Sequence, residues 1–207
     1  MSKRAIPILS VVAVISVAIW YGLHAGHEQK ITHPISGERI IAFGDSLIEG
    51  VGASSGNDMV LRLSRALGIP IINAGRGGDT TQSALQRLER DVLSQNPRIV
   101  LVLLGGNDAL GRVAKEDVQR NLSVIIDRIT GAGAAVLLLG VRSGFLQSQY
   151  NDTLAQLARE KPVTYIPDIL AGVFGHADLM SDPIHPNDAG YTKMAERILP
   201  VIQKMLK

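Results

Sequence analysis

A serine, a histidine and an aspartate in this sequence have the types and spacing needed for acyl transfer. Ser46 follows Gly44-Asp45 at the end of a short apolar run, where glycine allows a sharp turn that exposes the hydroxyl. A serine hydroxyl attacks a carbonyl only with the help of a neighbouring base. His185 lies in the proline-stiffened segment SDPIHP, with Asp182 three residues earlier to orient its ring. We therefore expect Ser46 as nucleophile, His185 as base and Asp182 as orienting acid.

Acyl transfer also needs hydrogen-bond donors aimed at the oxyanion, often worth about 3 kcal/mol each. Gly78, in the segment NAGRGGDT, offers an unobstructed backbone N–H. Asn107, in the segment GGND, offers a side-chain amide. The backbone N–H of Ser46 is the third expected donor.

Each of these segments, taken alone, is more often an ordinary turn or helix cap. Their joint occurrence favours the catalytic interpretation, because four independent turns have no reason to supply nucleophile, donors, acid and base together. The remaining polar residues of the segments, Asp45, Asp79 and Asp108, are expected to cap helices and brace loops. His176 is expected to be a surface loop residue.

The elements that must position these residues alternate between strands and helices. Short β-rich apolar runs predict strands near residues 40–43, 70–73, 99–104, 135–140 and 163–166. Helical spacing of apolar residues separates them, and a last helix carries Tyr191, Met194, Ile198 and Ile202, with Pro200 expected to kink or end it. Such alternation predicts an α/β fold with about five parallel strands covered by helices on both faces. Functional loops then gather at the carboxyl ends of the strands.

The segments FGDSL, NAGRGGDT, LLGGND and SDPIHPND resemble the four sequence blocks of the GDSL or SGNH hydrolases. The resemblance spans nearly all of residues 39–205 and is greatest to bacterial acyl-CoA thioesterases and lysophospholipases. It implies a three-layer, flavodoxin-like α/β/α fold and acyl hydrolysis with no cofactor and no metal. Ser46, Gly78, Asn107 and His185 match the residues that name the family. The chain departs from the pattern in residues 48–52 and 142–148, which leaves the substrate open.

The first 38 residues differ from the rest. Lys3 and Arg4 precede the uncharged stretch Ala5 to Leu23, which is long enough to cross a bilayer as a helix. We expect residues 1–23 to be a signal anchor or, alternatively, a cleaved signal peptide, residues 24–38 a linker, and residues 39–207 the hydrolase domain. The domain would then be exported, either anchored to the inner membrane or secreted. The basic excess of the chain lies in this N-terminal part, so nothing points to nucleic acid.

The expected substrate is a small-molecule or lipid acyl ester or thioester. Ala109, Leu110 and Val113 follow the Asn107 loop and are expected either to line an acyl groove or merely to pack the next helix. An O-acetyl esterase acting on cell-envelope polysaccharide would use the same catalytic residues. A membrane-tethered binding module with an inactive fold is the non-enzymatic alternative. A dinucleotide-binding loop fits poorly, because Thr80 occupies the position of the third glycine.

Overall fold

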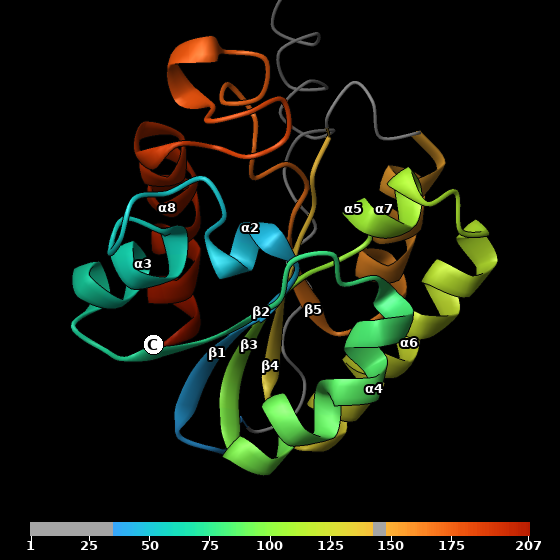
Figure 1. The fold of residues 1–207 in the computed structure, drawn as a ribbon. Helices are drawn as coiled ribbons and strands as arrows, with labels where there is room; N and C mark the ends of the chain where they lie inside the picture. The colour runs from blue at the N-terminus through green and yellow to red at the C-terminus, as the bar shows by residue number, and fades with distance from the viewer. Residues whose placement is uncertain (1–34, 143–147) are drawn as a thin grey trace, which may run out of the picture.

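The computed structural model describes residues 35–142 and 148–207. Five parallel strands form one sheet in the order β2-β1-β3-β4-β5 (Figure 1). Their bounds are β1 Arg39–Gly44, β2 Ile71–Gly75, β3 Pro97–Leu103, β4 Ala135–Leu139 and β5 Val163–Ile166. All five expected strands are present, and the parallel α/β architecture is confirmed.

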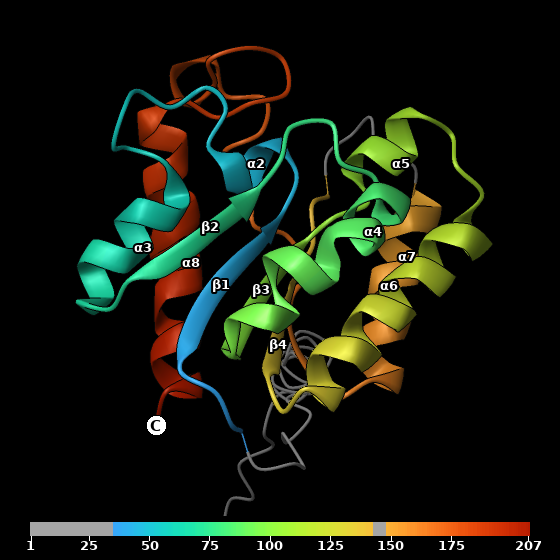
Figure 2. The ribbon, with the colours of Figure 1, turned by 60° about the horizontal axis from the view of Figure 1, so that its bottom comes forward.

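Helices cover both faces of the sheet (Figures 1 and 2). One face carries α2 Ser46–Glu49, α3 Met59–Leu67 and α8 Asp188–Met205, and the other carries α4 Thr81–Asp91, α6 Lys115–Gly131 and α7 Ser148–Glu160. Shorter elements complete the chain: α5 Gly106–Leu110, η1 Leu93–Gln95 and η2 Ala177–Leu179. The result is a three-layer α/β/α sandwich.

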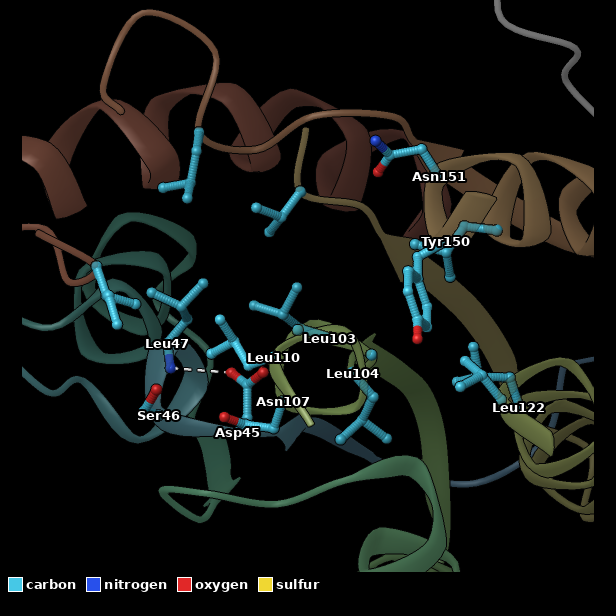
Figure 3. A pocket seen from close by; sticks show the side chains of 17 residues that line it. Asp45, Ser46, Leu47, Leu103, Leu104, Asn107, Leu110, Leu122, Tyr150 and Asn151 are labelled. Atoms are coloured by element: carbon cyan, nitrogen blue, oxygen red, sulfur yellow. Dashed lines mark hydrogen bonds between the residues drawn. The ribbon is translucent and has the colours of Figure 1, made fainter. Parts of the chain in front are cut away.

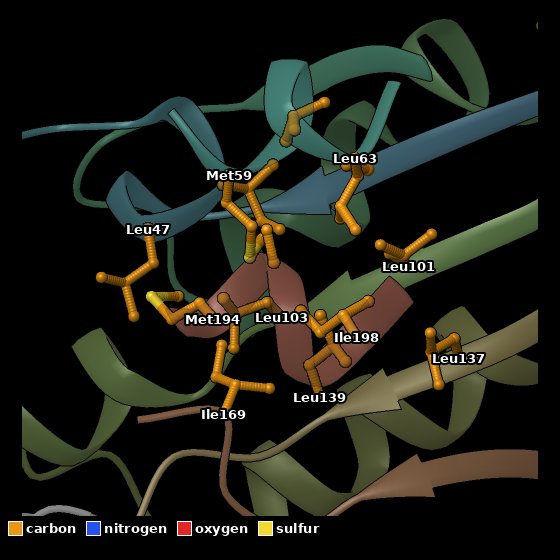
Figure 4. Packing of buried hydrophobic residues seen from close by; sticks show 14 of the residues in the cluster. Leu47, Met59, Leu63, Leu101, Leu103, Leu137, Leu139, Ile169, Met194 and Ile198 are labelled. Atoms are coloured by element: carbon orange, nitrogen blue, oxygen red, sulfur yellow. The ribbon is translucent and has the colours of Figure 1, made fainter. Parts of the chain in front are cut away.

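Alternation along the strands divides the interior into two apolar layers, because successive side chains of a strand point to opposite faces. In β1, Ile40 and Ala42 pack toward α3 and α8, whereas Ile41 and Phe43 pack toward α4 and α6. Figure 4 shows the first layer, with side chains from α3 and α8 meeting those of β3 and β4. The central strands are therefore buried on both faces, which explains their continuous apolar runs.

The sheet register brings the expected functional loops together. Gly44, the last residue of β1, pairs with Gly75 of β2 on one side and with Leu103 of β3 on the other. The chain segments that follow these three strands thus leave the sheet at one edge. The ligand site of an open parallel sheet lies at this kind of edge.

Helix α8 continues through Pro200 to Met205, so of the two expectations for this proline, a kink or a helix end, the helix end is wrong. An internal proline removes one hydrogen bond and clashes with the preceding turn, at a cost of about 3 kcal/mol. The buried face of α8, with Ile198 before the proline and Ile202 after it, packs into the apolar core. Tertiary packing on both sides of Pro200 outweighs the local preference.

The expected signal or anchor segment, residues 1–23, lies outside the described residues, as does most of the expected linker. Its described end already contacts the domain: Ile35 packs against the core, and the Ser36 N–H donates to the carbonyl of Gly133 at 2.9 Å. Within residues 35–142 and 148–207, no helix is long and apolar enough to cross a membrane.

Candidate active site

Ser46 is the first residue of α2, directly beyond the carboxyl end of β1. Asp45 caps this helix by accepting a hydrogen bond from the Leu47 N–H at 3.0 Å. Gly44 is required before the turn, because a Cβ there would lie 2.2 Å from the carbonyl oxygen of Leu103. The tight turn leaves the Ser46 side chain partly exposed at the edge of the sheet. As the first residue of a helix, Ser46 has a backbone N–H without an intrahelical acceptor.

Asp182 and His185 lie in the loop that precedes α8. One carboxylate oxygen of Asp182 accepts the backbone N–H groups of Ile184 and His185, each at 2.7 Å. Its other oxygen is 2.8 Å from Nδ1 of His185. The hydrogen bond to the His185 ring, helped by the two backbone donors, lowers the pKa of Asp182 to about 2. The carboxylate therefore stays charged and fixes the orientation of the imidazole.

The other ring nitrogen of His185 faces the serine. Nε2 of His185 lies 3.0 Å from Oγ of Ser46, although 139 residues separate the two along the chain. With the Nδ1 proton directed at Asp182, Nε2 has its lone pair free to take the hydroxyl proton. The structure thus brings Ser46, His185 and Asp182 into one hydrogen-bonded chain.

The two other expected oxyanion donors lie on neighbouring loops. Gly78 has a φ of +80° and open space where a side chain would project. A backbone with this φ favours glycine. Asn107, in the first turn of α5, uses one amide N–H to bind the carbonyl of Asp79 at 2.9 Å. The second N–H of its amide remains for a ligand, because an amide nitrogen carries two donors.

A buried arginine that the sequence analysis missed braces these loops. The Arg87 guanidinium of α4 donates to the Asp79 carboxylate at 2.5 Å, to the carbonyl of Ala74 at 2.9 Å and to that of Gly44 at 3.0 Å. It also lies over the ring of Phe43, 4.4 Å from the centroid. Arg87 also pairs with Asp91 one turn along the same helix, at 2.9 Å. The exposed Arg90 pairs with Asp91 as well, so this local pattern does not single out Arg87, and its contacts with the strand ends depend on the fold.

Asp108, which was expected to cap a helix or brace a loop, joins two helices. The fully buried Asp108 accepts both the backbone N–H and the hydroxyl of Thr81, at 2.9 and 2.7 Å, and so ties α5 to α4. Thr80 caps α4 in a reciprocal pair with Ser83. His176 is exposed, as expected.

An apolar cleft, partly open to solvent, runs from Ser46 toward α7 (Figure 3). Figure 3 shows Ser46 and Asp45 on one side of it and Leu122, Tyr150 and Asn151 on the other. Its aliphatic lining comprises Leu47, Leu103, Leu104, Leu110, Val118, Leu122, Val141, Leu154, Leu170 and Ile184. Among the described residues, no group of three or more His, Cys, Asp or Glu side chains is arranged to hold a metal.

Of the three residues expected to line an acyl groove, only Leu110 lines this cleft, with 49% of its surface exposed. Ala109 is buried in the core beside α4 and α6, and Val113 packs against the same core. The carbonyl of Val113 accepts a hydrogen bond from the Tyr150 hydroxyl, which closes the far side of the cleft. The three residues were expected there because they are apolar and follow the Asn107 loop, but only the exposed Leu110 lines the cleft.

Comparison with known proteins decides the family. The GDSL-like lipase/acylhydrolase family model matches residues 42–193. This chain belongs to that family. It is 27% identical over 188 residues to Esterase TesA of Pseudomonas aeruginosa, covering 85% of this chain and 93% of the relative. A crystal structure of TesA matches with a TM-score of 0.77 at 27% identity, over 81% of this chain and 99% of that one.

A second relative is the Thioesterase 1/protease 1/lysophospholipase L1 of Escherichia coli K12, 29% identical over 82% of this chain and 85% of the relative. The family member described here is therefore a serine ester hydrolase, and the alternative of an inactive binding module is set aside.

Burial of Asp45 beside Ser46 has a consequence for stability. Burial raises the pKa of Asp45 from its ordinary 3.8 to about 7, against the opposing effects of the Leu47 N–H and of His185. Between these two values the folded protein retains a proton that the unfolded chain has lost. The free energy of unfolding should therefore fall as the pH rises from about 4 to about 7.

We predict that Asp45→Asn, which keeps the cap and cannot ionise, removes this part of the pH dependence. Urea denaturation of both proteins at a series of pH values measures it. The free energy of unfolding of the variant, minus that of wild type, should rise as the pH increases from about 4 to about 7 and then stay constant. Curves that run parallel across the whole range would show that Asp45 does not carry the effect.

Proposed function

We propose that the protein hydrolyses acyl esters through a covalent acyl-enzyme on Ser46. The observation that carries the proposal is the chain of contacts from the Ser46 hydroxyl to Nε2 of His185 at 3.0 Å and from Nδ1 to Asp182 at 2.8 Å. In this arrangement His185 takes the hydroxyl proton while Oγ attacks the carbonyl carbon. The negative charge on the carbonyl oxygen is received by the N–H groups of Ser46, Gly78 and Asn107.

Collapse of the tetrahedral intermediate completes the first half-reaction. The bond to the leaving group breaks, and the departing alcohol or thiol takes the proton from Nε2 of His185. Water then gives a proton to the same nitrogen and attacks the acyl carbon. As the bond between that carbon and Oγ of Ser46 breaks, His185 returns the proton to Oγ and the acid is released. Asp182 remains ionised throughout and stabilises the imidazolium that forms in each half. Atoms and charge balance without a cofactor.

The substrates that fit the cleft best are esters of medium-length acyl chains, lysophospholipids among them. Ten aliphatic side chains line the cleft, and the reacting groups lie at one side of it. Burying each methylene of an acyl chain there contributes about 0.8 kcal/mol, whereas an acetyl group leaves most of the lining unused. Relatives named as an esterase and as a thioesterase and lysophospholipase support this substrate class.

The N-terminal segment forms the second part of the proposal. The uncharged stretch Ala5 to Leu23, preceded by Lys3 and Arg4, is proposed to anchor the protein in the inner membrane with the domain exported. A hydrolase held there meets lipids and envelope polymers rather than cytosolic acyl-CoA.

Ser46→Ala should lower kcat for p-nitrophenyl butyrate by about 10⁴-fold or more, because the acyl-enzyme cannot form. Its melting temperature should stay close to that of wild type, since one partly exposed hydroxyl contributes little to stability. Ser94→Ala, at an exposed serine of η1, is the matched control and should retain full activity. Substantial turnover by folded Ser46→Ala would remove Ser46 from its role.

Leu110→Asp should lower kcat/KM for the octanoyl ester at least tenfold and change that for the acetyl ester less than twofold, because only the longer chain reaches the apolar lining. Val124→Asp places the same charge on an exposed valine of α6 outside the cleft and should affect neither ester. Equal losses for all chain lengths, together with a preference for acetylated sugars, would instead favour the polysaccharide O-acetyl esterase.

For the anchor, we predict that the full chain stays in the membrane fraction through a high-salt wash and that deletion of residues 1–23 releases it. A periplasmic reporter fused after residue 207 should be active. A soluble natural form whose N-terminus lies near Gly26 would show cleavage and contradict the anchor.

A further inference from the structure

The loop between β2 and α4 carries Gly78 and is rich in glycine. It follows Gly75, the last residue of β2, and two of its first three residues, Gly77 and Gly78, are glycine, which has the greatest backbone freedom of any residue. A donor improves catalysis only when it is held in place before the oxyanion forms. The Asp79 N–H closes a turn over Gly77 and Gly78 by donating to the carbonyl of Arg76 at 3.2 Å, and Glu49 holds this turn from outside.

Glu49 is the last residue of α2, three positions after Ser46. Its carboxylate oxygen Oε2 accepts the backbone N–H of Gly77 at 2.5 Å. Gly77 directly precedes Gly78, so this hydrogen bond fixes the peptide next to the expected donor. The Glu49 side chain is exposed, and the sequence blocks shared with the family give it no role.

Gly77 also lies near Ser46. A Cβ built on Gly77 would lie 2.9 Å from Oε2 of Glu49 and 4.0 Å from Cβ of Ser46. An added Cβ at position 77 would therefore push the Glu49 carboxylate aside, whereas it would reach Ser46 at ordinary van der Waals distance. The Gly77–Gly78 backbone thus lies beside Ser46 and is held there by a residue of the same short helix.

Backbone contacts make this helix a firm support. The Glu49 N–H donates to the carbonyl of Asp45 at 3.0 Å, which holds Glu49 in register with the Ser46 turn. Asn73 of β2 donates to the carbonyl of Ile48 at 2.8 Å and accepts the N–H of Gly75 at 2.9 Å. The start of the loop and the end of α2 are therefore joined by Asn73, and the middle of the loop by Glu49.

We propose that Glu49 is a positioning residue that holds the Arg76–Gly77 peptide, and through it the adjoining Gly77–Gly78 peptide, so that the Gly78 N–H is aimed at the oxyanion next to Ser46. The inference rests on the proposed acyl transfer through Ser46. Glu49 acts through the acceptor oxygen that it offers to Gly77 and makes no contact with the reacting atoms. Its effect should accordingly appear in the transition state and leave the binding of the ground-state substrate nearly unchanged.

The test compares Glu49→Ala, Glu49→Gln and the control Glu196→Ala, which removes an equally exposed glutamate from α8. With p-nitrophenyl butyrate, Glu49→Ala should lower kcat by about 10- to 50-fold and change KM by less than about threefold, because one donor is misplaced rather than removed. Glu49→Gln retains an acceptor oxygen and should recover to within about threefold of wild type. Glu196→Ala should match wild type.

An alkyl trifluoromethyl ketone gives a second readout, because it adds a serine hydroxyl to form a stable oxyanion. Its inhibition constant should rise in Glu49→Ala by about the factor by which kcat/KM falls, as expected of an interaction made only with the oxyanion. A merely structural loss, in which part of the protein is unfolded, would lower kcat and leave the inhibition constant of the folded fraction unchanged.

The proposal is overturned if kcat of Glu49→Ala stays within twofold of wild type, if Glu49→Gln is as impaired as Glu49→Ala, or if the change lies mainly in KM. These failures are separate from failure of the acyl-enzyme mechanism. If that mechanism is wrong, Ser46→Ala retains activity. If only the Glu49 inference is wrong, Ser46→Ala is inactive while Glu49→Ala turns over normally.

Discussion

The buried guanidinium of Arg87 joins the strand ends from which the active-site loops depart. It binds the carbonyl of Gly44, the last residue of β1, and that of Ala74, the last but one of β2, and it pairs with Asp79 in the loop after Gly78. Removing one partner of such a buried pair typically costs about 3–5 kcal/mol, because the other charge is left without compensation. Ser46 follows β1 and Gly78 follows β2, so the contacts of Arg87 with both strands help to place the two residues relative to each other.

Short-range contacts then set each reacting group within that frame. Asp45 caps the helix that begins at Ser46. Asp182 accepts hydrogen bonds both from the backbone of its own loop and from the His185 ring. Asn107 donates to the carbonyl of Asp79. Ser46, Asn107 and His185 are thus held by hydrogen bonds, and the first two line the apolar cleft. In such a site, electrostatic interactions with developing charge are stronger than in water.

The five strands and the order of the functional segments could be predicted from sequence, because apolar periodicity and turn chemistry are local signals. For the same reason the loops of Ser46, Gly78 and Asn107 could be assigned to one sheet edge. Arg87 and Glu49 could not be found in this way, since their partners lie on other strands and loops. Likewise, the path of α8 through Pro200 and the exclusion of Ala109 from the cleft depend on packing that no single segment encodes.

The central claim, a covalent intermediate on Ser46, is tested most directly by trapping the nucleophile. The protein is treated with an alkyl fluorophosphonate, digested, and mapped by tandem mass spectrometry. The account predicts one phosphonyl adduct, located on Ser46, whose formation follows the loss of esterase activity in time. An adduct on another residue, or complete inactivation with Ser46 unmodified, would contradict it.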